Sequence, residues 1–126
     1  MCSSDLLAVA AGGAAGALLR WIANDAAGRA FGTQFPWGIL GVNIIGSLAM
    51  GILYVLFVER DLVPEPWRAG LLVGLLGAFT TFSTFSLQAL QLAEQGRFGA
   101  ALGYCLMSVA MCVGAAFAGA TLARMI

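Results

Sequence analysis

Hydroxyl side chains crowd into one short stretch of this chain, GLLGAFTTFSTF at positions 74–85, inside an otherwise apolar run. They are Thr80, Thr81, Ser83 and Thr84, and Gly77 precedes them. A glycine and hydroxyls that compete for backbone carbonyls both weaken a helix, so we expect a break here. Carbonyls freed by such a break can coordinate a cation. The alternative is a kinked, continuous helix whose hydroxyls bond back to the preceding turn.

Other polar side chains are few, and each allows a structural and a functional interpretation. Asn43, within LGVNIIGSLAMG, either bridges helices or lines a wet path. Arg20, beside a tryptophan, either extends to the lipid headgroups or supplies positive potential at an anion entrance. Tyr104, Ser108 and Cys112 recur at every fourth position, which places them along one stripe of a helix. That stripe either lines a pathway or holds hydroxyls bonded to their own backbone.

Few side chains in this sequence are of the types that carry out catalysis. Histidine is absent, and the three cysteines, Cys2, Cys105 and Cys112, have no metal-binding spacing. No pair of nucleophile and base stands out, so we expect no enzyme activity. No acidic or basic tail is present to engage nucleic acid.

Composition identifies the elements that must position these residues. The 126 residues are 61% hydrophobic and 10% charged, which indicates an integral membrane protein. Four apolar runs each reach roughly the 20 residues that cross a ~30 Å hydrocarbon core. We therefore expect an all-α membrane protein made of one domain, residues 1–126, with a break near the bilayer midplane in its third helix. The expected helices are about 5–24, 37–58, 68–93 and 97–123.

Arginine placement bears on orientation in the membrane. If the helices alternate, Arg60, Arg68 and Arg124 face one side, while Arg29 and Arg97 face the other and Arg20 ends the first span. This near balance gives almost no orienting bias. The chain can then insert both ways, and oppositely inserted copies can pair as an antiparallel dimer. A single orientation fixed by other factors is the alternative. Because side chains fill the core of four packed helices, a transport path would lie between subunits.

Taken together, these residues resemble the small bacterial fluoride channels of the Fluc, or CrcB, family. The resemblance covers the whole chain: four spans, Arg20 followed by an aromatic residue, GVNIIGS around Asn43, and above all G-x-x-G-x-x-T-T-F-S-T-F at 74–85. It implies a multi-pass protein of the bacterial inner membrane that passively exports fluoride for fluoride resistance. It also implies a dual-topology homodimer with two pores and a structural Na⁺ at its centre, held by the carbonyls of Gly77 and Thr80.

The same resemblance assigns the pore residues. Its pore phenylalanines correspond to Phe82 and Phe85, its pore asparagine to Asn43, and its fourth-helix polar track to Tyr104 and Ser108. Ser83 and Thr84 add hydroxyl donors for the anion, and Arg20 stands at the anion vestibule. Two positions depart from the family pattern, since Gln88 replaces a common carboxylate and Cys112 replaces a hydroxyl.

The two rival functions are an exporter and a membrane assembly subunit. A small dual-topology multidrug or cation exporter needs an intramembrane carboxylate for proton coupling. The six acids lie instead at the termini or in the expected loops: Asp5, Asp25, Glu59, Asp61, Glu65 and Glu94. A membrane assembly subunit that transports nothing explains the many glycines but not a polar segment at the midplane.

Overall fold

The computed structural model describes residues 3–126, and all the regular structure in that range is helical. Four helical segments there are long and apolar enough to cross a membrane. The first is α1 (Ser3–Phe31), and the second joins α2 (Trp37–Leu53) to the π-helical η1 (Tyr54–Glu59). The third joins η2 (Ala69–Leu76), α3 (Gly77–Phe79) and α4 (Phe82–Glu94), and α5 (Phe98–Arg124) is the fourth. The predicted all-α membrane architecture with four spans is confirmed, whereas Cys2 lies outside the described residues.

The first helix is longer than predicted. It continues to Phe31 rather than ending near residue 24. Asp25 and Arg29 form an i,i+4 ion pair at 3.1 Å, which supports the additional turns. The helix ends where Gly32 takes φ +83°, a conformation that only glycine adopts readily, and its N–H donates to the Gly28 carbonyl at 2.9 Å. Arg20 therefore lies within the helix and not at its end.

Glycines allow the spans to pack backbone against backbone. A methyl group added at Gly12 would overlap the carbonyl oxygen of Gly70, and one at Gly16 would overlap that of Leu75. The same is true of Gly51, where α2 meets α5. The close approach has a simple cause, because small residues are what allow helices to touch closely in lipid.

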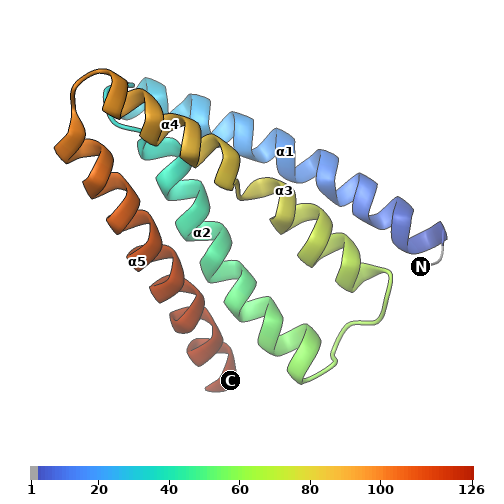
Figure 1. Ribbon diagram of the computed structural model, residues 1–126. Coiled ribbons are helices and arrows are strands. Elements are labelled where there is room, and N and C mark those ends of the chain that lie inside the picture. Colours follow the sequence, from blue (N-terminus) through green and yellow to red (C-terminus); the bar gives the residue numbers. More distant parts are fainter. Residues whose placement is uncertain (1–2) are drawn as a thin grey trace.

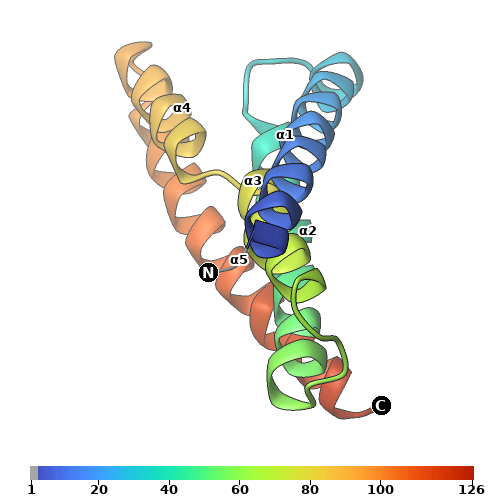
Figure 2. The same cartoon turned by 90° about the vertical axis from the view of Figure 1, so that its right-hand side faces the viewer.

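The third span changes neighbours along its length. Its first part, η2 and α3, packs against α1, whereas α4 packs against α5 (Figure 1). Viewed from the side, α4 leans away from α1 after a short connecting segment at residues 80–81 (Figure 2). The α2 helix packs mainly against α5. The core between α2, α4 and α5 consists of five buried side chains: Ile39, Leu40, Phe85, Leu92 and Tyr104.

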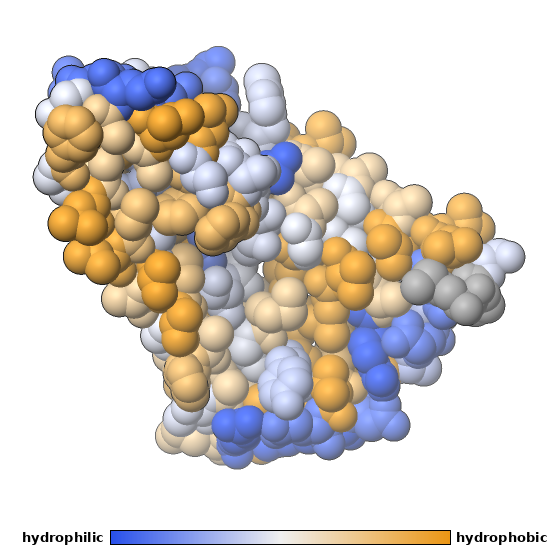
Figure 3. Space-filling model, viewed as in Figure 1, coloured by the Kyte–Doolittle hydropathy of each residue, from blue (hydrophilic) through white to orange (hydrophobic). Residues whose placement is uncertain are grey.

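Polar groups gather at two ends of the molecule, with mostly apolar surface between them (Figure 3). One end carries the α1–α2 connection and the α4–α5 turn, and the other carries the connection from η1 to η2 together with the C-terminus. At the second end Arg124 donates to both carboxylate oxygens of Glu59, at 3.2 and 2.7 Å. The distribution fits a protein whose middle lies in hydrocarbon and whose ends lie in water.

Candidate functional site

Two residues in the third span depart from helical geometry. The α3 helix ends at Phe79, Thr80 has ψ 157°, Thr81 has φ −153° and ψ 124°, and α4 begins at Phe82. Both threonines contribute to local order. The Thr80 hydroxyl donates to the Leu76 carbonyl at 3.0 Å, and the Thr81 hydroxyl accepts from the Thr84 N–H at 3.2 Å, which caps the start of α4.

Asn43 on α2 holds this extended segment by its backbone. Its side-chain oxygen accepts from the Thr81 N–H at 2.8 Å, and its amide nitrogen donates to the Thr81 carbonyl at 3.1 Å. These two bonds replace the helical partners that an extended residue lacks. A primary amide carries two N–H donors, so one remains for another partner.

Arg20 reaches the same region from α1. Its guanidinium donates to the Ala78 carbonyl at 3.1 Å, in a half-buried setting. The side chain therefore satisfies a carbonyl at the end of α3. Of the two interpretations open at the start, this contact does not fit extension of Arg20 to the headgroups.

The two carbonyls predicted to bind a cation belong to Gly77, the first residue of α3, and to Thr80, which follows its last residue. Among their neighbours, the Ala78 carbonyl accepts from Arg20 and the Thr81 carbonyl accepts from Asn43. The Leu76 carbonyl accepts from both the N–H and the hydroxyl of Thr80. Neutral carbonyl oxygens suit a hard monovalent cation.

A groove of about 370 Å³ opens beside the extended segment and gathers residues from α2, α4 and α5. Five predicted site residues line it: Asn43, Thr80, Phe82, Phe85 and Ser108. The two phenylalanine rings lie 5.4 Å apart between centroids. The Ser108 hydroxyl oxygen is buried and has no hydrogen-bond partner among the described residues. None of the residues that line the groove is charged.

The remaining predicted residues lie around the groove rather than in its wall. Ser83 and Thr84 occupy the first turn of α4, and Gly77 and Arg20 lie on the α3 side. Tyr104 is fully buried, its ring centroid is 5.0 Å from that of Phe85, and its hydroxyl donates to the side-chain oxygen of Gln88 at 2.9 Å. Tyr104 thus connects the groove to the glutamine that departs from the family pattern.

Sequence reasoning missed Ser47 and Met50, which also line the groove. Ser47 stands four residues after Asn43, so the shared helix face was a readable signal. It lines the groove together with Cys112 of α5. The polar wall therefore includes α2 as well as the predicted stripe on α5.

Residues 7–120 match the model of the family described as "CrcB-like protein, Camphor Resistance (CrcB)". The chain belongs to this family.

Curated relatives agree over nearly the full length. A protein of Magnetococcus marinus is 49% identical over 118 residues, which cover 94% of this chain and 96% of the relative. A protein of Chelativorans is 50% identical, with 96% and 97% covered, and one of Nitrobacter hamburgensis is 45% identical, with 96% of each covered. The first two are named "Fluoride-specific ion channel FluC" and the third "Fluoride-specific ion channel FluC 1". This CrcB-family chain is thus similar to proteins named for one anion.

Proposed function

We propose that this protein is a passive, fluoride-selective channel of the bacterial inner membrane that exports cytoplasmic fluoride. Its relatives carry that activity in their names, and channels are not enzymes, so the prediction of no enzyme activity is confirmed. The observation that carries the proposal within this chain is the uncharged groove where Asn43, Phe82, Phe85 and Ser108 meet.

Fluoride is small and tightly hydrated, so a pore must offer hydrogen-bond donors as the ion sheds water. The groove offers the remaining N–H of Asn43 and the unpartnered hydroxyl of Ser108, and the nearby Ser83 and Thr84 hydroxyls extend this set. Phenylalanine rings have positive edges that can face an anion. The α4 helix begins beside the groove, and a helix N-terminus carries partial positive charge. We assign Arg20 to the anion vestibule that leads to this groove.

The multidrug exporter is disfavoured by the position of the acids and by family membership. Proton antiport needs a carboxylate that changes protonation inside the membrane. No acid lines the groove, and the one acid in the later turns of α1, Asp25, is paired with Arg29 at 3.1 Å. Passive conduction follows.

The test is anion efflux from liposomes that contain the purified protein, with a potassium ionophore setting the voltage. We expect rapid loss of fluoride and retention of chloride, with no requirement for a pH gradient. Equal chloride efflux, or transport only under a pH gradient, would contradict the proposal.

We further propose an antiparallel dual-topology homodimer with two pores and third spans that are broken and cross at the dimer centre. The balanced arginines and the wide exposure of Phe82, at 77%, support a second copy against this face. Cysteine labelling at Gly32 and Pro64, in a background without native cysteines, should modify each position from both sides of the membrane. Labelling from one side only would refute dual topology.

A structural sodium at that crossing completes the proposal. It would be held by the Gly77 and Thr80 carbonyls of each chain, which lie beside the two extended residues of the third span, and it would supply fixed positive charge there. Removal of sodium during purification should weaken dimer assembly, and isotope measurement should find about one ion per dimer. Full assembly in sodium-free buffer would contradict this assignment.

A further inference from the structure

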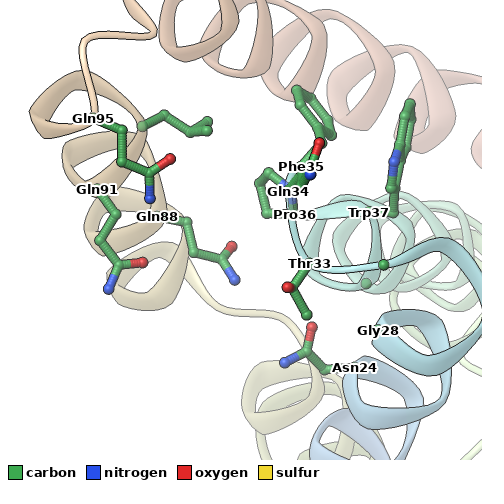
Figure 4. Close-up of a pocket in the computed structure, with 13 residues that line it drawn as sticks. Asn24, Gly28, Thr33, Gln34, Phe35, Pro36, Trp37, Gln88, Gln91 and Gln95 are labelled. Atoms are coloured by element: carbon green, nitrogen blue, oxygen red, sulfur yellow. The ribbon is translucent and has the colours of Figure 1, made fainter.

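The two ends of the molecule differ in their hollows. At the end with the α1–α2 connection, a space of about 150 Å³ has three glutamines of α4 on one side and Asn24 of α1 on the other (Figure 4). A larger hollow, of about 470 Å³, lies toward the opposite end, between α1 and the start of the third span. The described residues that line it are alanine, glycine, leucine, proline and tryptophan, so this hollow is apolar.

The apolar hollow is long and narrow-walled on its α1 side. One wall consists of four small residues on one face of α1, at i, i+3, i+4 and i+7: Ala8, Ala11, Gly12 and Ala15. The facing wall includes Trp67, Leu71 and Leu75. From Ala8 to Ala15 the first wall is roughly 10 Å long at 1.5 Å per residue. That is about two-thirds of one leaflet of a ~30 Å hydrocarbon core, so the hollow has the length of part of one acyl chain.

Trp67 and Asp5 mark the aqueous end of the hollow. Trp67 is 65% exposed, and tryptophan is enriched at membrane–water interfaces. Asp5 lies one turn before Ala8 on α1, and its Oδ1 oxygen is buried with no hydrogen-bond partner among residues 3–126. Arg68, the residue after Trp67, is bound instead to Asp61. Because a buried carboxylate oxygen without a partner is costly, a cationic donor at this end would stabilise it.

We propose that the apolar hollow binds one acyl chain of a phospholipid whose headgroup carries a primary ammonium, and that this ammonium donates to the Asp5 carboxylate. The chain gains dispersion contacts that an empty hollow lacks. A primary ammonium has three N–H donors and a quaternary ammonium has none, so phosphatidylethanolamine fits and phosphatidylcholine does not. A lipid suits this place better than a second copy, because the hollow shares no lining residue with the groove where the second copy is proposed.

The experiment uses Trp67 as the probe. The parent chain carries Trp21→Phe and Trp37→Phe, which leaves Trp67 as its one tryptophan. It is reconstituted in phosphatidylglycerol vesicles that contain increasing fractions of phosphatidylethanolamine or phosphatidylcholine with the same brominated chains, which quench a tryptophan that they touch. We expect half-maximal quenching at about tenfold less phosphatidylethanolamine than phosphatidylcholine, the ratio that one hydrogen bond to a charged group provides.

Three variants of the parent separate the headgroup from the chain. Asp5→Ala should make the two lipids equal, because only the contact with the ammonium is removed. Ala11→Leu should weaken quenching by both lipids, because its side chain fills the hollow. Ala10→Leu, exposed on another face of α1, is the matched control and should behave as the parent.

Two results would overturn the site. Equal quenching of the parent by both lipids, or parent-like quenching in Ala11→Leu, would mean that Trp67 meets only bulk lipid. Weak quenching of the parent by both lipids would mean that a second copy of the chain covers the hollow. A tenfold preference that survives Asp5→Ala would overturn the contact between the ammonium and Asp5.

Discussion

The two hydrogen bonds between Asn43 and Thr81 allow a quantitative prediction about how the third span is held. Thr81 is 8% exposed and extended, and Asn43 supplies partners to its N–H at 2.8 Å and its carbonyl at 3.1 Å. In Asn43→Ala both backbone groups lose that partner. A buried group left unpaired costs ~1–3 kcal/mol, so two groups give ~2–6 kcal/mol.

A competing estimate is smaller, because interhelical side-chain hydrogen bonds in bilayers average ~0.6 kcal/mol. That average reflects groups that find other partners when separated. Thr81 has none while it is extended, although water in the adjacent groove can satisfy part of the loss. We therefore expect Asn43→Ala to lower the free energy of unfolding by ~2–4 kcal/mol.

Asn43→Asp separates the two bonds. At neutral pH its carboxylate still accepts from Thr81 N–H but has no proton for the Thr81 carbonyl. The bond to the Thr81 carbonyl is therefore the one that Asn43→Asp removes.

The assay is denaturation in mixed micelles titrated with SDS and followed by tryptophan fluorescence. Ser86→Ala is the control, because the Ser86 hydroxyl donates at 3.0 Å to the Phe82 carbonyl of its own helix and lies exposed. If Asn43→Ala costs less than ~1 kcal/mol relative to this control, the two bonds do not hold the segment.

Three further predictions follow from the packing and the groove. Gly16→Val should fail to give a folded protein or should lower the unfolding temperature sharply, because its side chain would overlap the backbone of the third span. Gly103→Ala should be tolerated, because a methyl group there meets open space. Thermal unfolding of both variants is the measurement. Phe82→Ile should reduce fluoride flux and keep the fold, because Phe82 is 77% exposed. Phe85→Ile should reduce both flux and stability, because Phe85 is only 9% exposed. Normal flux in both variants would exclude a role for the ring edges. A small thiol reagent should slow fluoride efflux through Cys112, which lines the groove, and Cys112→Ala should be resistant; equal inhibition of both would place the reactive thiol elsewhere.

The spans were predictable because their signal is local. The length of an apolar segment is enough to predict that it crosses the membrane. This criterion placed the second, third and fourth spans within a few residues of their observed bounds. The end of α1 was not placed correctly. Polar residues after position 22 looked like a loop, yet the Asp25–Arg29 pair and the Gly32 cap extend the helix to Phe31.

Partners across helices were harder to predict, because they depend on which faces meet. The sequence left Asn43 as either a bridge or a pore residue, and the structure gives it both a bridge to Thr81 and a place on the groove wall. The contact from Arg20 to the Ala78 carbonyl depends on which face of α1 packs against α3, and spacing along the chain does not give that. The bond between Tyr104 and Gln88 joins helices that sequence spacing could not register against each other.

The change of neighbours within the third span has a consequence for biogenesis. The partner of η2 and α3 is α1, which precedes them in synthesis, whereas the partner of α4 is α5, which follows it. In the two-stage picture, inserted helices associate only once both are in the membrane. A nascent chain that has emerged as far as Gly96 can therefore dock the first part of the third span but not the second. The extended residues at 80–81 lie at the boundary between an early and a late docking event, so α4 reaches its final position only when the last helix enters the bilayer.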